Sequence, residues 1–355
     1  MARTFLSFIV FFAFIATSAA SDWVLYTIGG RDYVSMNNIA EFYNLDKIRR
    51  KGNEIVLMSN TRSLRAFEGS QDLFINNLKF ILSYPAMEHS GQICISRMDL
   101  VKLVEPVMRP SRIKSDVPMD TVVLDAGHGG HDAGAGSLYG SEKQFTLDTV
   151  LRAKQLLQQA GYKVVLTRTG DYFVPLNERA EIASRHKSAI FISIHFNHGG
   201  MGTGVEAFTL APRGVPSMMA DGPTVSDFND CPGNARDQEN MALATASHAA
   251  LVMKTRMQDR GLKRARFVVI REISIPGVLI EGGFMSNPYD AKMIATPLYR
   301  QTLAASVLQA VENYRKAVGT QSGPIVETKP PPKKTSPKSR GSKPGPIAPP
   351  TLEAE

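Results

Sequence analysis

Four side chains that can bind a metal or move a proton each stand where an apolar run gives way to a polar or glycine-rich turn. They are His128 in Leu124-Asp125-Ala126-Gly127-His128-Gly129-Gly130, Glu142 in Ser141-Glu142-Lys143, His195 in Ser193-Ile194-His195-Phe196-Asn197, and Glu281 in Leu279-Ile280-Glu281-Gly282-Gly283. Two imidazoles and one carboxylate form the ligand set of many catalytic zinc sites, which keep a fourth position for water. The remaining carboxylate, Glu281, can take a proton from that water and deliver it to a leaving amine.

The spacing of these residues is by itself a weak signal, because they are widely separated and no His-Glu-x-x-His motif is present. A lone histidine at the end of a strand is more often structural than a ligand. The predicted strands that position these residues strengthen the inference that they belong to one site. In parallel sheets reactive groups gather at the carboxyl ends of strands, and all four residues fall at such ends.

Residues 119 to about 318 alternate apolar strands with helices. The pattern predicts strands over 121–125, 163–168, 189–196, 205–210, 267–271 and 277–281, and helices over 142–160, 176–186, 237–260 and 288–317. Continuous apolar strands separated by helices indicate an α/β fold, a mainly parallel twisted sheet with helices on both faces.

Three further polar residues near these strands are weaker site candidates. Asp125 either orients a metal-bound histidine or caps a turn. Asn197 either touches substrate or belongs to a solvent-facing loop. Arg271 can bind a substrate carboxylate through two parallel hydrogen bonds, although a role outside the site is the more common one for such a residue.

Residues 22–110 predict a separate, small α+β domain. Gly29-Gly30 and Asn76-Asn77 are expected at hairpin turns, strands are expected over 54–59, 64–67 and 73–82, and Ser35 and Ser96 are expected to cap short helices. The pattern resembles the N-terminal domain of copper amine oxidases. Because the segment has no cluster of histidines, cysteines or paired carboxylates, we expect an accessory module, whose ligand the sequence does not identify.

The two ends of the chain have different compositions. Residues 1–20 combine Arg3, a 13-residue apolar run and small residues, which is typical of a cleaved export signal, with an uncleaved anchor as the alternative. Residues 320–355 are rich in proline and lysine and are expected to form a disordered tail. The tail is either simply solvated or weakly attracted to an anionic surface. We therefore expect an exported protein, periplasmic or extracellular and associated with the cell envelope.

The overall composition narrows the function classes. A 43% hydrophobic content over 355 residues suits folded domains, and a net charge of +8 favours an anionic partner without naming one. The cations are spread along the chain without a nucleic-acid-binding motif, so no nucleic-acid partner is expected. The chain has only two cysteines, Cys94 and Cys231, which excludes a four-cysteine zinc site. We expect two free thiols, with an interdomain disulfide as the alternative.

The motifs together resemble the zinc-dependent N-acetylmuramoyl-L-alanine amidase family of cell-wall hydrolases. The matching stretches are Val123 to Gly130, Ser141-Glu142-Lys143, Ser193-Ile194-His195 and Leu279 to Asn287, in that order. The resemblance implies that His128, Glu142 and His195 bind one zinc ion per chain and that Glu281 is the general acid/base. It also implies peptidoglycan as substrate, cleaved at the amide between N-acetylmuramic acid and the first L-alanine of the stem peptide. We expect a monomer.

One segment departs from several family members, in which an inserted helix blocks zinc until a partner displaces it. Residues 211–234 contain four prolines and three glycines, which disfavour a long helix. The sequence therefore predicts an open site that needs no activator. Two other functions stay open at this point: a non-catalytic peptidoglycan-binding protein that retains the fold, and a zinc carboxypeptidase of the cell wall.

Overall fold

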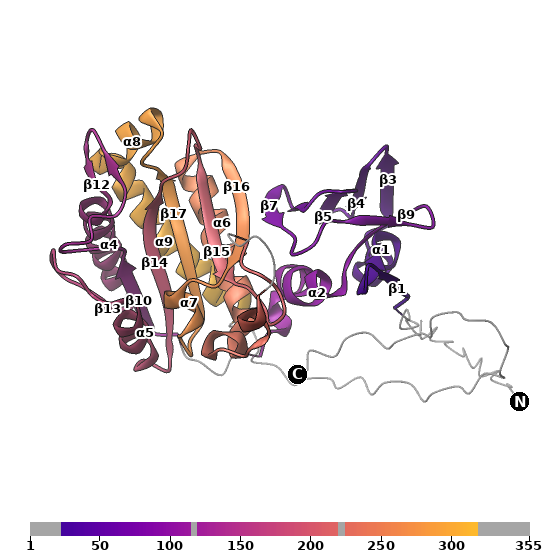
Figure 1. The fold of residues 1–355 in the computed structure, drawn as a ribbon, viewed down its shortest axis with the longest axis horizontal. Coiled ribbons are helices and arrows are strands. Elements are labelled where there is room, and N and C mark those ends of the chain that lie inside the picture. Colours follow the sequence, from indigo (N-terminus) through magenta and orange to yellow (C-terminus); the bar gives the residue numbers. More distant parts are fainter. Residues whose placement is uncertain (1–22, 115–118, 219–223, 319–355) are drawn as a thin grey trace, which may run out of the picture.

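The computed structural model describes residues 23–114, 119–218 and 224–318, which form a small α+β domain followed by a larger α/β domain (Figure 1). The segments interpreted as an export signal and a disordered tail lie outside these residues. Among the residues described, no helix combines the length and apolar character needed to cross a bilayer.

The small domain consists of hairpins packed around one longer helix. Its elements are β1 (Leu25–Ile28), β2 (Arg31–Ser35), α1 (Met36–Tyr43), β3 (Lys47–Lys51), β4 (Glu54–Met58), β5 (Ser63–Phe67), β6 (Asp72–Ile75), β7 (Leu78–Ile81), β8 (Met87–His89), β9 (Gln92–Ser96), α2 (Arg97–Asp99) and α3 (Glu105–Met108). The two predicted helix caps are confirmed, because the Ser35 side chain accepts from Asn38 N and the Ser96 side chain accepts from Asp99 N.

The large domain alternates strands and helices. Its elements are β10 (Thr121–Ala126), β11 (Gly136–Ser137), β12 (Gly140–Ser141), α4 (Glu142–Gln159), β13 (Lys163–Leu166), α5 (Leu176–Ser184), β14 (Ala189–Asn197), β15 (Val205–Leu210), α6 (Asp237–Thr255), β16 (Asp259–Ala265), α7 (Val268–Arg271), β17 (Gly277–Phe284), α8 (Pro288–Ile294) and α9 (Pro297–Val318).

The prediction of a mainly parallel sheet is confirmed, with one reversal. Strands β13, β10, β14 and β17 are parallel neighbours in that order, whereas β15 pairs antiparallel with β17 and parallel with β16. The reversal has a simple cause. Only the loop 198–204 separates β14 from β15, and a parallel return connection needs about a dozen residues or more.

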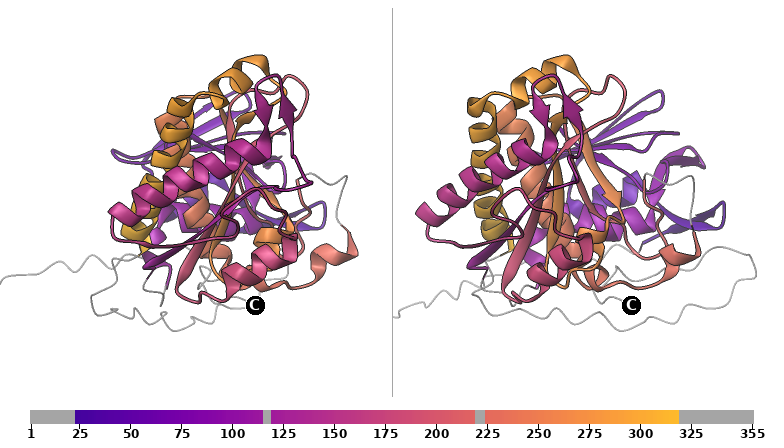
Figure 2. Two further views of the ribbon diagram at one scale, coloured as in Figure 1. Left: turned by 90° about the vertical axis from the view of Figure 1, so that its left-hand side faces the viewer. Right: turned by 60° about the vertical axis from the view of Figure 1, so that its left-hand side comes forward.

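Helices cover both faces of this sheet, as expected. On one face, Ile190, Ile192 and Ile194 of β14 join a buried cluster with residues of α4, α6 and α9. On the other face, Phe191 of β14 joins a second cluster with residues of α5 and α7. Figure 2 shows α4 and α9 side by side on the first of these faces.

The prediction of a strand over 267–271 was wrong. These residues include the short helix α7, and the strand lies earlier, at β16 (Asp259–Ala265), where the predicted helix was expected to continue to residue 260. The sequence of β16 has few apolar residues, so its strand character is weak. It is a strand because both its edges are paired, to β15 on one side and to β7 of the small domain on the other.

This pairing makes one sheet of eleven strands that passes through both domains, in the order β13-β10-β14-β17-β15-β16-β7-β6-β5-β4-β3. At the junction Phe80 is the parallel partner of Leu262, and both side chains are fully buried. Asp99 of the small domain and Arg264 of β16 form an ion pair of 2.7 Å beside it. The domains therefore share a buried boundary.

The described part of residues 211–234 contains two short 3-10 helices, over Val225–Phe228 and from Pro232 onward to Arg236, and no α-helix. It begins where β15 ends. Because β15 runs antiparallel to β17, that point lies at the edge of the sheet opposite to the carboxyl ends of β10, β14 and β17. Arg266 anchors the segment there through the carbonyls of Pro212 and Asp227.

Candidate metal centre

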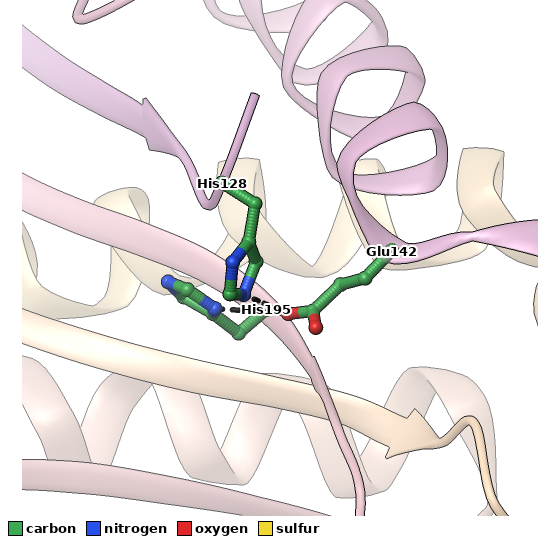
Figure 3. A group of neighbouring side chains, drawn as sticks. All are labelled: His128, Glu142 and His195. Atoms are coloured by element: carbon green, nitrogen blue, oxygen red, sulfur yellow. Dashed lines mark hydrogen bonds and ion pairs between the residues drawn. The ribbon is translucent and has the colours of Figure 1, made fainter. Parts of the chain in front are cut away.

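Three of the four predicted residues converge at the carboxyl edge of the parallel strands. His128 follows β10, Glu142 is the first residue of α4, and His195 is near the end of β14 (Figure 3). Glu142 Oε1 lies 3.1 Å from His128 Nε2 and 2.9 Å from His195 Nδ1. One ligand atom from each residue can be chosen so that all three lie within 4.8 Å of one another.

The carboxylate of Glu142 is buried and ionised. Its Oε1 accepts from Phe196 N at 3.0 Å, and its Oε2 accepts from Ala135 N at 2.8 Å. Burial alone raises the pKa of Glu142, but the hydrogen bonds and charges of His128 and His195 outweigh it and hold the pKa well below its ordinary value. An ionised carboxylate between two imidazoles is ready to accept a cation.

His128 is oriented from behind by Asp132. The Oδ2 atom of Asp132 lies 2.8 Å from His128 Nδ1, on the opposite side of the ring from Glu142. Metal-binding histidines ordinarily donate their second ring N–H to such an acceptor. His128 also has a φ of 61°, in the left-handed region that side chains seldom adopt, so the surrounding structure must hold its backbone in place.

Two buried arginines hold that backbone. Arg179 donates to the carbonyl of His128 at 2.7 Å, and Arg168 donates to the carbonyls of Ala126 and Gly127. The Asp125 carboxylate belongs to this clamp, because it accepts from Arg179 Nη1 at 2.7 Å and also from Thr167 and Ser193. Asp125 thus acts on His128 through Arg179, which holds the His128 carbonyl, and Asp125 itself lies within β10.

Glycines allow the histidine rings to approach the backbone. A Cβ atom at Gly127 would lie 2.3 Å from His195 Cε1. A Cβ atom at Gly134 would lie 2.6 Å from His128 Cδ2 and 2.7 Å from Glu142 Oε2, and Gly134 has a φ of 64°. Any side chain at these two positions therefore displaces the candidate ligands.

Glu281 lies beside this group, on the neighbouring strand. Its Cα partner is His195 on β14 in one direction and Glu206 on β15 in the other, so the three side chains share one face of the sheet. Glu281 Oε2 is buried and has no hydrogen-bond partner among the described residues. Burial, followed by the charges of Glu142 and Glu206, raises the pKa of Glu281 well above its ordinary value, and Lys263 opposes the shift.

The two remaining candidates have different positions. Asn197 ends β14 near the site and donates through Nδ2 to Glu206 Oε1 at 2.6 Å. Arg271 ends α7, which precedes β17, and so lies at the amino edge of the parallel strands, away from the site (Figure 1). Its Nε donates to the adjacent Glu272. The structure therefore does not bring Arg271 to His128, Glu142 and His195, which favours the alternative of a role outside this site.

The cysteines do not join the domains. Cys94 is buried in β9, Cys231 is partly buried, and both are free thiols, as expected.

Comparisons with known proteins identify the large domain. The sequence model of the family described as N-acetylmuramoyl-L-alanine amidase matches residues 122–313. N-acetylmuramoyl-L-alanine amidase AmiA of Escherichia coli K12 is 31% identical over 244 residues, covering 62% of this chain and 84% of that protein. The chain belongs to the N-acetylmuramoyl-L-alanine amidase family.

Other members of this amidase family are similar over the same part of the chain. A sporulation-specific N-acetylmuramoyl-L-alanine amidase of Bacillus subtilis 168 is 31% identical over 203 residues, covering 56% of this chain and 70% of that protein. The solved catalytic domain of the amidase CwlV from Bacillus (Paenibacillus) polymyxa var. colistinus is 28% identical, covers 56% of this chain and 99% of that chain, and has a TM-score of 0.47.

The family match contains all four predicted residues of the amidase site. The supporting residues Asp132 and Glu206 were not found from the sequence as parts of the site. Asp132 could have been suspected, since a carboxylate four residues after a histidine in a glycine-rich loop can fold back onto the ring. Glu206 comes from another element, and nothing in its local sequence connects it to Glu281.

Proposed function

We infer that this amidase is a zinc-dependent peptidoglycan hydrolase that cleaves the amide between N-acetylmuramic acid and the L-alanine of the stem peptide. The observation that carries the inference is the convergence of His128, Glu142 and His195, with Glu281 on the next strand. The family supplies the enzyme class and the name of the bond. The geometry supports the residue roles that we propose.

The residues present fit a zinc ion. The candidate ligands are two imidazole nitrogens and one carboxylate oxygen, which is a common catalytic zinc set. Asp132 supports one imidazole, and Gly127 and Gly134 leave the space that the rings require. Zinc held here supplies a Lewis acid that polarises the scissile carbonyl and activates water.

Glu281 is the residue that moves the proton. Its buried Oε2 has no competing partner among the described residues, and a pKa raised by burial suits a carboxylate that must both accept and release a proton. It takes a proton from the attacking water and gives it to the leaving amine of L-alanine. Glu142 cannot share this role, since its low pKa keeps it ionised.

A similar protein of Staphylococcus epidermidis, LytH, is named a probable cell wall amidase, and we infer that this chain also acts in the cell envelope. No activator is required in this proposal. The described part of residues 211–236 lies at the opposite edge of the sheet from His128 and His195, and it contains no α-helix that could cover them.

The test is digestion of purified peptidoglycan by the purified full chain alone, with the fragments identified by mass. We expect peptides with a free L-alanine amino terminus and glycan chains that keep the lactyl group. A chelator should stop the reaction, and zinc should restore it. Glu281→Gln should lower the rate by about a hundredfold or more, while elemental analysis still finds one zinc per chain.

Other outcomes would contradict the proposal in recognisable ways. Release of free amino acids would indicate a carboxypeptidase. Binding without turnover, in both the parent and Glu281→Gln, would indicate a non-catalytic peptidoglycan-binding protein. Turnover only after a partner protein is added would contradict the absence of an activator.

A further inference from the structure

The small domain presents a row of cations on one face of its sheet. Arg49 of β3, Val56, Arg65, Phe74 and Lys79 of β7 are successive Cα partners across five neighbouring strands. Their side chains therefore point to the same side, with a cation on every second strand, about 10 Å apart. Lys47 and Lys51 flank Arg49 on this side. We call Lys47, Arg49, Lys51, Arg65 and Lys79 the basic face.

The basic face is open to solvent. Along β4, β5 and β6 the alternate residues that point the other way, such as Leu57, Leu64 and Leu73, are fully buried against the α1 side. Those that share the side of the basic face are partly exposed throughout. All five residues of β3, the outermost strand of the sheet, are exposed.

Three of these cations are unpaired within the part of the chain that the structure describes. Arg65 pairs with Glu54, and Lys79 pairs with Asp72. Arg50, which points to the opposite side, pairs with Glu88. No described carboxylate lies within ion-pair distance of Lys47, Arg49 or Lys51. Glu54, the Cα partner of Lys51, shares this side of the sheet and pairs with Arg65, so this end of the face keeps a net positive charge.

The basic face and the catalytic residues lie on the same side of the continuous sheet. At the domain junction Phe80 and Leu262 are partners that point to the buried side, so their neighbours Lys79 and Lys263 point to the other. Consistent with this, a Cβ atom at Gly261 would lie 3.3 Å from Lys79 Cγ. Lys263 contacts Glu206, the strand partner of Glu281.

We propose that the basic face is a second binding site for peptidoglycan, which holds the polymer through the free carboxylates of its stem peptides while the large domain cleaves it. This inference rests on the amidase function proposed above. Charge complementarity supports it, and so does the continuity of the face with the catalytic side.

Two simpler explanations of the basic face account for fewer of its residues or features. Cations on an edge strand discourage pairing between sheet edges, which explains β3 but not Arg65 and Lys79 on inner strands. A membrane-binding surface needs exposed apolar side chains beside its cations. The exposed large apolar residues of the described small domain are Val24, Ile48 and Met87. Val24 precedes β1, Ile48 points to the opposite side, and Met87 lies in β8; Val56 and Phe74 on the basic face are only partly exposed.

The test compares two triple variants of the full chain in a Glu281→Gln background, which binds without cleaving. The basic-face variant is Lys47→Gln/Arg49→Gln/Lys51→Gln. The matched control, Lys254→Gln/Arg315→Gln/Lys316→Gln, removes three exposed cations from the ends of α6 and α9, on the other side of the large sheet. Binding is measured by sedimentation with purified sacculi over a series of salt concentrations, and thermal unfolding is measured for each variant.

We expect the basic-face variant to bind sacculi about tenfold or more weakly at low salt, while the control binds like its parent. Binding by the parent should weaken as salt is added. When the carboxylates of the sacculi have been blocked by amide coupling, the parent and the basic-face variant should bind them with equal affinity. Equal binding by both triple variants would overturn the proposal, as would tighter binding to vesicles of phosphatidylcholine and phosphatidylglycerol than to sacculi.

The same substitutions with Glu281 intact separate this proposal from the function on which it rests. On a short soluble muramoyl-peptide, the basic-face variant should cleave at the parent rate, because the fragment reaches only the catalytic residues. On intact sacculi its rate at low substrate concentration should fall with its binding. If the parent fails to cleave the soluble fragment, the amidase proposal fails; if both substrates slow equally, only the second site fails.

Discussion

At the scale of residues, the candidate metal site depends on close packing around His128, Glu142 and His195. The Glu142 carboxylate is held by two backbone N–H groups and two imidazoles, and glycines rather than side chains face the rings. The ligand types and the glycines beside His128 were evident from the sequence. Their mutual distances were not, because β10, α4 and β14 are brought together only by the sheet.

We predict that Gly134→Ala weakens zinc affinity by about tenfold or more, comparable with the loss of an outer contact to a metal ligand. The new methyl group would press on His128 and Glu142, and the residue would also keep an unfavourable positive φ. Competition with a coloured chelator measures the affinity. Gly136→Ala is the control, since nothing lies within 4 Å of a Cβ there; equal losses in both variants would exclude the steric explanation.

Glu281 is expected to lower the stability of the metal-free protein. Its pKa is raised in the folded state, mainly by burial, so the folded protein keeps a proton that the unfolded chain has lost above about pH 4.3. The free energy of unfolding therefore falls as pH rises from that value toward the raised pKa. Glu281→Gln should be more stable than the parent at neutral pH in chelator.

This advantage should disappear near pH 4, where both folded and unfolded Glu281 are protonated. Urea unfolding at several pH values measures it, and the titration of groups that do not interact with Glu281 cancels in the comparison. A parent that is more stable than Glu281→Gln at neutral pH would show that the Glu281 carboxylate has a stabilising partner.

At the scale of elements, the sequence pattern predicted the strands that are apolar and missed those that form only because a neighbouring strand pairs with them. Residues 205–210 were predicted as a strand and form β15. The segment Lys47–Lys51 has a single apolar residue, and Asp259–Ala265 begins with Asp-Arg-Gly, so neither shows the alternation of a half-buried strand. Both are strands because a neighbouring strand offers them hydrogen bonds.

The ends of β10 and α5 are joined by the buried pair of Asp125 and Arg179. We predict that Arg179→Gln lowers the free energy of unfolding by about 3 kcal/mol or more, because it leaves the Asp125 charge buried and the carbonyl of His128 without its donor. Urea denaturation measures the loss. Arg185→Gln, at the exposed end of the same helix, should change stability by less than about 0.5 kcal/mol.

At the scale of the whole molecule, the sequence indicated two domains but not how they meet. The junction is made by Phe80 with Leu262 and by Asp99 with Arg264, pairs separated by more than 160 residues. No local pattern connects them, and β16 itself was not predicted. The consequence is a protein whose two cores share one buried boundary.

We predict that the parent chain unfolds in a single calorimetric transition and that Arg264→Gln separates it into two. The variant leaves Asp99, which is fully buried, without its cation at the boundary. Arg185→Gln again serves as the control and should keep one transition. Two transitions in the parent would show that the boundary is too weak to couple the domains.

The pairing of β7 with β16, where Phe80 lies opposite Leu262, also fixes the small domain against the large one. A module attached by a flexible connection explores many orientations, whereas here the orientation of the small domain follows from strand pairing and sheet twist. Whatever binds the small domain, whether wall polymer, regulator or antibody, therefore also holds His128, Glu142 and His195 in place, and the reach of the enzyme is set by the width of its own sheet.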